Sequence, residues 1–174
     1  FNAKLNIYPV NYGEIFPISG GLPVSKRPPQ RQKLRLQELT RWSKFLNINL
    51  NTQPNFFPSK SLLPSLIIIA AKMEKLDNYF ELAFKIMNSL WVENQDIDDE
   101  DVLKKILNRM NFDAENIILL AKSEKCLDIM NKYTQLAITK NVFGAPTYII
   151  EDQIYWGQDR LDFVERHLNS MNMD

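Results

Sequence analysis

Alternating polar and apolar residues open the chain at Ala3–Val10, with the period of a half-buried strand. Pro9 restricts such a strand to an edge of a sheet or to the strand's own end. The stretch Gly13–Gln32, rich in Gly and Pro, predicts a long irregular loop. Apolar residues then recur at helical spacing and predict a helix over Gln32–Leu46, followed by a second irregular stretch over Asn47–Lys60.

Helical patterns dominate the middle of the chain, from Ser61 to Asn141. Ser61 is placed to cap the first of these helices. Asp98 and Asp113 stand where two later helices would have their N-caps. After the helix that begins near Ser61, the predicted segments are Asn78–Val92, Asp99–Met110, Asp113–Lys122 and Glu124–Thr139.

The C-terminal part of the chain changes character. Thr147–Ile150 predicts a strand, Glu151–Gln153 a turn, and Ile154–Trp156 the partner strand of a hairpin. Gly157 ends the hairpin, and Arg160–Met171 predicts a last amphipathic helix. A strand, a helical block, then a hairpin and a helix is the order of an α/β unit that carries a helical insertion.

Composition narrows the possible functions. The 174 residues are 45% hydrophobic and carry 21 Lys and Arg against 21 Asp and Glu, and the absence of a basic run argues against nucleic-acid binding. The longest apolar run, Leu66–Ala71, is far short of the roughly 20 residues of a membrane span. A single cysteine, Cys126, excludes an internal disulfide and a C-x-x-C pair, and a single histidine, His167, argues against a metal centre. With no signal-peptide pattern, we expect a cytoplasmic protein that binds neither metal nor membrane.

Two motifs near the end are the most specific features, Val142–Thr147 (VFGAPT) and Trp156–Leu161 (WGQDRL). They are accompanied, in order, by Pro28–Gln32, Glu38–Trp42, Phe56–Pro58, Leu90–Trp91 and Asp96–Ile97. With these motifs the chain resembles the 2-hydroxychromene-2-carboxylate isomerase family, relatives of the kappa-class glutathione transferases. The resemblance extends from about Leu5 to Leu168. It implies an α/β DsbA-like thioredoxin fold, with a thioredoxin-like domain over 1–60 and 142–174 and an all-helical insertion domain over 61–141.

The same resemblance implies a glutathione site. It places a cis bond before Pro146, so that the Ala145 backbone holds the cysteinyl part like an added strand. It places the γ-glutamyl end at the start of the last helix. The implied glutathione-binding residues are Ala145, Pro146, Trp156, Gly157, Gln158 and Asp159. The residues alone favour a simple tight turn at Gly144–Pro146 and a helix cap at Asp159.

Three cations, Lys26, Arg27 and Arg31, follow the first predicted strand. They can pair with the glycyl carboxylate of glutathione or with a carboxylate substrate, although scattered loop cations are more often solvated. Phe56 and Phe57 can line an aromatic substrate pocket, although two phenylalanines before a proline are commonly core residues. We therefore take Lys26, Arg27, Arg31 and Phe56 as candidate substrate-binding residues.

The catalytic residue stays unassigned. In the family, an N-terminal strand leads to a Ser that activates the glutathione thiol, whereas Phe1–Val10 matches the family's second strand. The Ser therefore lies upstream of Phe1 in the family pattern, and Ser19 and Ser25 stand in the wrong segment. Many relatives also have an Asn after Thr-Gly, where this chain has Ser19-Gly20-Gly21.

Three functions of different classes follow. The first is a glutathione-dependent isomerase, or a kappa-like glutathione transferase, acting on a small aromatic substrate. The second is a thiol–disulfide oxidoreductase of the DsbA-like class, and the third is a helical interaction module without catalysis. The family usually pairs, so we also expect a homodimer.

Overall fold

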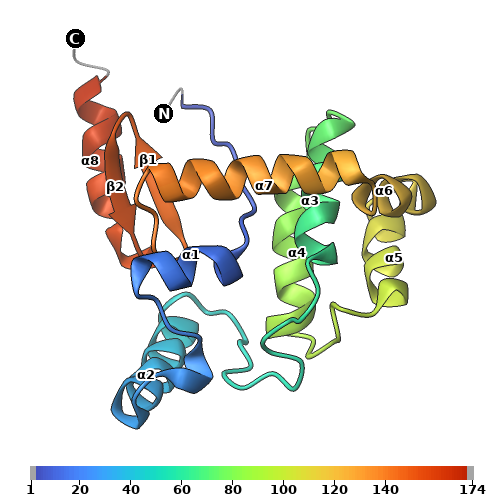
Figure 1. Cartoon of the computed structure of the whole chain (residues 1–174). Coiled ribbons are helices and arrows are strands. Elements are labelled where there is room, and N and C mark those ends of the chain that lie inside the picture. The colour runs from blue at the N-terminus through green and yellow to red at the C-terminus, as the bar shows by residue number, and fades with distance from the viewer. Residues whose placement is uncertain (1–2, 172–174) are drawn as a thin grey trace. The chain divides into compact units, whose positions relative to one another are not determined.

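Helices make up most of the computed structural model, which describes residues 3–171 (Figure 1). The chain divides into two compact units. The first combines Phe1–Leu22 with Asn131–Asp174, and the second is Pro23–Met130. The long helix α7 (Glu124–Thr139) contributes residues to both units.

The first unit contains the hairpin. The hairpin consists of β1 (Thr147–Ile150) and β2 (Gln153–Trp156). The unit also contains α1 (Tyr12–Ser19), the short 3-10 helix η2 (Gln158–Arg160) and α8 (Leu161–Met171). The two strands are antiparallel, with Thr147 opposite Trp156 and Ile150 opposite Gln153. The predicted hairpin is therefore confirmed, and the last helix begins one residue later than predicted.

Helix α8 packs along both strands of the hairpin (Figure 1). The Tyr155 hydroxyl lies 2.9 Å from His167 Nδ1, and His167 Nε2 lies 3.6 Å from the Glu151 carboxylate. These contacts tie β2 and the turn of the hairpin to α8. His167 therefore has a structural role where α8 contacts the hairpin.

Helix α1 forms a small core with the end of α7. Ile15 is buried against Ala137 and Val142, with Tyr12 packed beside them. The Asn11 side chain accepts a hydrogen bond from Gly13 N at 2.9 Å and so caps α1. Burial raises the pKa of Tyr12 to about 12.

Two predictions for the N-terminal part are wrong. Ala3–Val10 forms no strand, because β1 and β2 pair with one another and no strand elsewhere in the described range 3–171 offers it a ladder. Tyr8 packs edge-on against Tyr133 at 4.7 Å between ring centroids, and Val10 packs against the core around Ile15. The predicted loop Gly13–Gln32 contains α1, because the Asn11 cap starts the helix and Pro17 falls only two residues before its end.

Gly20 ends α1 with a left-handed φ of 73°, the conformation that glycine adopts without steric cost. The chain then enters the second unit through the 3-10 helix η1 (Val24–Lys26). Helix α2 (Pro29–Phe45) follows and begins three residues before its predicted start. Pro29 occupies its first position, where a missing N–H has no consequence.

The second unit is a bundle of short helices joined to α2 by an irregular segment over residues 46–62. Its other helices are α3 (Leu63–Met73), α4 (Tyr79–Trp91), α5 (Glu100–Arg109) and α6 (Ala114–Ala121). Helix α3 packs on α6 and α4, and its Ile67 and Ile69 are almost fully buried. The span 61–141 contains helices and no strand, as predicted, while the domain bounds 1–60, 61–141 and 142–174 stay a prediction.

The acids before α5 differ from their predicted roles. Asp99, not Asp98, caps α5 by accepting a hydrogen bond from Asp101 N at 2.9 Å. Asp98 instead accepts hydrogen bonds from Ser59 Oγ at 2.5 Å, Lys60 N at 2.7 Å and Ser61 N at 3.2 Å. It thereby fixes the segment that leads into α3.

Candidate functional site

The hairpin brings the two most specific sequence motifs together. Gly157 N donates a hydrogen bond to the Pro146 carbonyl at 2.9 Å, one step beyond the strand pair Thr147–Trp156. The Thr147 hydroxyl donates to the Gly144 carbonyl at 2.5 Å and fixes the turn from the other side. The residues around Ala145 therefore lie beside the residues that start η2.

The Ala145 backbone is available at this edge. Ala145 is exposed, and its N–H and C=O form no hydrogen bond with any residue in the described part of the chain. The bond between Ala145 and Pro146 is cis, as the resemblance implies. A free N–H and C=O beside the end of a strand can pair with an extended peptide.

An aromatic wall stands next to this backbone. The Phe143 and Trp156 rings lie 5.0 Å apart at 56°, and Trp156 is 50% exposed. A Cβ on Gly144 would overlap Trp156 Nε1 and come within 3.0 Å of Cε2. Glycine at position 144 therefore leaves room for the indole to approach the backbone closely.

Opposite charges lie beside each other at the start of η2. Asp159 Oδ2 accepts a hydrogen bond from Arg160 Nη1 at 3.0 Å, and both side chains are about half exposed. Gly157 has a φ of 110°, and a Cβ there would overlap Asp159 Oδ1. Glycine is favoured at 157 because a φ of 110° is strained for any residue that has a Cβ, whereas the Asp159 carboxylate could move aside.

The six predicted glutathione-binding residues thus belong to one unit and gather at one end of the hairpin. The candidate substrate-binding residues belong to the other unit. Lys26 ends η1, Arg27 follows it, and Arg31 stands in the first turn of α2. Phe56 is 39% exposed in the segment before α3 and lines neither of the two hollows of this unit described below.

A hollow of about 230 Å³ in the second unit is lined by Phe57 and by Arg35, and Arg35 was not predicted from the sequence. The Arg35 guanidinium lies 5.1 Å from the ring centroid of Phe57 and 5.6 Å from that of Trp91. The residues that line the hollow are Val24, Gln32, Arg35, Leu36, Thr52, Gln53, Pro54 and Phe57. Of the two adjacent phenylalanines, Phe57 therefore lines the hollow and Phe56 does not.

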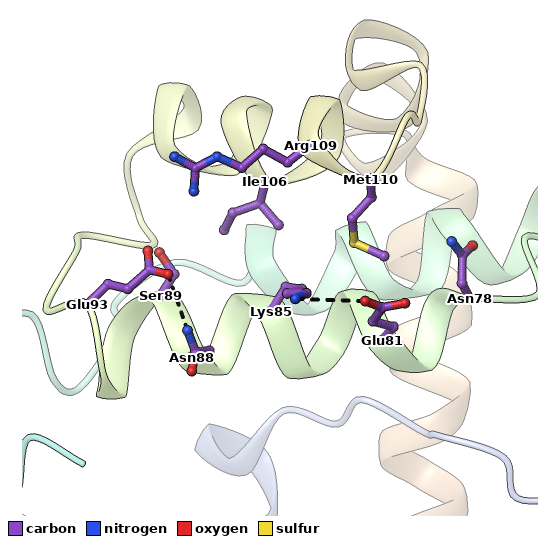
Figure 2. A pocket seen from close by; sticks show the side chains of 9 residues that line it. All are labelled: Asn78, Glu81, Lys85, Asn88, Ser89, Glu93, Ile106, Arg109 and Met110. Carbon is purple, nitrogen blue, oxygen red and sulfur yellow. Dashed lines mark hydrogen bonds and ion pairs between the residues drawn. The ribbon is translucent and has the colours of Figure 1, made fainter. Parts of the chain in front are cut away.

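A second hollow lies between α4 and α5, and Figure 2 shows its lining. Several of its polar side chains are paired with a neighbouring side chain. Lys85 Nζ lies 3.8 Å from Glu81, and Asn88 Nδ2 donates to Glu93 at 3.2 Å (Figure 2). The buried Ser89 hydroxyl donates to Gln95 at 3.0 Å. We assign no function to this hollow.

Cys126 belongs to the second unit, near the start of α7. It is fully buried, and its Sγ donates a hydrogen bond to the Leu66 carbonyl at 3.3 Å. Burial raises its pKa to about 11. The thiol is therefore protonated at neutral pH.

Residues 3–171 contain neither a group of metal ligands nor a membrane-spanning helix. No three His, Cys, Asp or Glu side chains in that range are grouped as metal ligands. Within the same range, none of the helices combines the length and the apolar character that a bilayer crossing needs.

The fold and the cis-Pro turn beside the hairpin define a class of protein. The chain belongs to the DsbA-like thioredoxin domain family, whose model matches residues 1–169. Among named proteins it is similar to 2-hydroxychromene-2-carboxylate isomerases. The relative from Sphingobium xenophagum is 25% identical over 146 residues, which are 84% of this chain and 72% of the relative. The relative from Pseudomonas sp. (strain C18) is 23% identical over 128 residues, which are 74% of this chain and 58% of the relative.

A solved structure of a 2-hydroxychromene-2-carboxylate isomerase has the same fold. It superposes with a TM-score of 0.71 at 21% identity, covering 93% of this chain and 78% of that chain. The resemblance and the DsbA-like thioredoxin fold expected from the sequence are both confirmed.

Proposed function

We propose that the protein is a glutathione-dependent isomerase of the 2-hydroxychromene-2-carboxylate isomerase type, acting on a small aromatic substrate. The relatives named as such isomerases support the reaction class. The observation that carries the glutathione site is the hydrogen bond from Gly157 N to the Pro146 carbonyl. It places a free peptide edge beside a pair of opposite charges.

The residues present fit glutathione. The Ala145 N–H and C=O can accept the cysteinyl residue as an added strand. The γ-glutamyl end carries an ammonium and a carboxylate on one carbon, and Asp159 and Arg160 offer the complementary charges side by side. Backbone N–H groups of Gln158 and Asp159, in the first turn of η2, add donors for the carboxylate.

When bound, glutathione supplies a thiolate that adds reversibly to the substrate and permits rotation about the bond it saturates. The residues of this chain bind and orient. Trp156 and Phe143 form an aromatic wall beside Ala145, against which the peptide can lie. Lys26, Arg27 and Arg31 are proposed to meet a carboxylate of glutathione or of the substrate.

A kappa-like transferase would use the same glutathione site with a different acceptor. A DsbA-like oxidoreductase needs two thiols, whereas this sequence contains Cys126 alone, buried and protonated. The structure therefore offers no feature that favours the oxidoreductase.

The proposal is tested by following the isomerisation of 2-hydroxychromene-2-carboxylate with the purified chain. We expect the isomerisation rate to rise with the concentration of glutathione and then to saturate. Conjugation of glutathione to 1-chloro-2,4-dinitrobenzene, measured in parallel, tests the alternative that the protein is a kappa-like transferase. Isomerisation at the same rate without glutathione, or conjugation alone, would contradict the proposal.

A further inference from the structure

A chain of hydrogen bonds joins the hairpin to α8. The Tyr155 hydroxyl donates to Gln153 Oε1 at 3.0 Å. A hydroxyl has a single hydrogen, so Tyr155 accepts from His167, whose Nδ1 lies 2.9 Å away. His167 Nδ1 therefore carries a proton, and this proton holds β2 to α8. Only 13% of the His167 side chain is exposed, and a hydrogen bond shielded from water is stronger than an exposed one.

His167 also contacts the turn of the hairpin. Glu151 has a φ of 53° there, which residues with a Cβ rarely adopt. From this position its carboxylate faces His167 Nε2 at 3.6 Å. The next residue, Asp152, accepts a hydrogen bond from Lys140 Nζ at 2.6 Å. Both ring nitrogens of His167 thus face the hairpin, whose turn is held by a second contact at Lys140.

The two halves of the proposed glutathione site lie on the two elements that His167 joins. Ala145 precedes β1, whereas Asp159 belongs to η2, from which α8 continues directly at Leu161. Helix α8 packs on both strands of the hairpin and on η2 (Figure 1). Between β2 and η2 stands Gly157 alone, and glycine leaves the backbone free to turn. A shift of α8 on the hairpin would therefore move Asp159 relative to Ala145.

We propose that His167 is a positioning residue of the glutathione site, which sets the distance between Ala145 and Asp159 by fixing α8 on the hairpin through Tyr155. The inference rests on the proposed function, because glutathione is the ligand that would span the two positions. We place His167 outside the site itself, since it stands six residues after the start of α8, nearly two helical turns from η2.

The test is calorimetric titration of glutathione into the full chain and its variants, each made with Asp159 unchanged and with Asp159→Asn. His167→Leu removes the donor and keeps apolar bulk, whereas His167→Asn keeps a donor near the place of Nδ1. Tyr155→Phe removes the hydroxyl alone and also serves if His167→Leu fails to fold. Tyr148→Phe is the matched control, because Tyr148 stands opposite Tyr155 on β1 and its hydroxyl forms no hydrogen bond within the described part of the chain.

With Asp159 unchanged, His167→Leu and Tyr155→Phe should each raise the dissociation constant of glutathione about fivefold, the effect of one ordinary hydrogen bond. His167→Asn and Tyr148→Phe should raise it by less than about twofold. In the Asp159→Asn background, His167→Leu and Tyr155→Phe should cost less than about twofold, because the charge that they position is gone.

A role in stability alone predicts the same loss in both backgrounds, and that result would overturn the proposal. Unchanged affinity in His167→Leu and Tyr155→Phe, or an equal loss in Tyr148→Phe, would also overturn it and leave the proposed function standing. If the unchanged chain fails to bind glutathione, the proposed function is contradicted and the positioning role falls with it.

Discussion

Gly144 and Trp156 lie so close together that position 144 has no room for a Cβ, which would overlap the indole Nε1. The contact joins the turn before β1 to the end of β2. It places the half-exposed indole beside the free Ala145 backbone. The geometry of the proposed glutathione site therefore depends on the small size of Gly144.

Gly144→Ala should displace the Trp156 indole. Because Trp156 is half exposed, the ring can swing toward solvent, and we expect a modest loss of about 1–2 kcal/mol in the free energy of unfolding. Glutathione affinity should fall with it. Tryptophan fluorescence, urea unfolding and glutathione titration measure the three effects.

A double variant tests whether overlap with the indole causes the loss of stability expected for Gly144→Ala. In a Trp156→Phe background the smaller ring leaves space, so Gly144→Ala should cost less stability there than in the natural chain. Equal costs in the two backgrounds would show that the overlap with the indole is not the reason.

Periodicity predicted the helical block well because its helices bury one face. Helix α5 buries Leu103, Ile106 and Leu107 and exposes its charged residues. Apolar residues on one helix face recur at helical spacing in the sequence, so such a helix can be predicted. Helix α1 was missed because Gly13 and Pro17 are typical of loops, and its Asn11 cap is a single polar residue. The strand predicted over Ala3–Val10 was wrong because alternation alone does not supply a partner strand.

The candidate site was predicted in part. The family motifs located the end of the hairpin, including Asp159 and the cis bond at Pro146. Arg35 was missed because a cation in a helix is ordinarily solvated, and only the fold shows that Phe57 and Trp91 flank it. The seven cations among residues 26–44 were the one signal in the sequence.

Asp98→Ala should destabilise the helical unit. The carboxylate accepts hydrogen bonds from Ser59, Lys60 and Ser61, and their loss should cost about 1–3 kcal/mol at pH 7. Burial alone would raise the pKa of Asp98, but these hydrogen bonds and the charge of Lys60 hold it below its usual value. The stabilisation is therefore present above about pH 4, the pKa of an unfolded Asp, and disappears as the pH falls through the lower folded pKa.

Urea unfolding at several pH values measures this difference. Asp128→Ala, which removes an exposed carboxylate on α7, is the control and should change stability by less than about 0.5 kcal/mol. A deficit of Asp98→Ala that persists undiminished at pH 2 would show that the ionised carboxylate is not its source.

Cys126 should resist thiol reagents in the folded protein. Its pKa of about 11 leaves little thiolate at pH 8, and burial excludes the reagent. Reaction with Ellman's reagent should be slow in buffer and fast in guanidinium, where the pKa returns to about 8.5. Rapid reaction of the folded protein at pH 8 would show that the Cys126 thiol is accessible and would contradict this prediction.

We predict that the protein is a homodimer in solution. Several large apolar side chains are exposed in the single chain, Phe45 at 78% and Leu119 at 72% among them. Light scattering after size exclusion should give twice the 20.4 kDa of one chain. A mass of one chain across the accessible concentration range would refute this prediction.

The measurement that tests the central claim most directly is calorimetric titration of glutathione into the chain and its Asp159→Asn variant. Asn keeps the shape of Asp159 and removes the charge offered to the γ-glutamyl ammonium, so affinity should fall about tenfold, in line with a charge-assisted hydrogen bond. Asp162→Asn removes an exposed carboxylate from the first turn of α8 and should change affinity less than twofold. We expect saturable binding of glutathione that depends on Asp159 and not on Asp162; no binding, or equal affinities in all three proteins, would contradict the account.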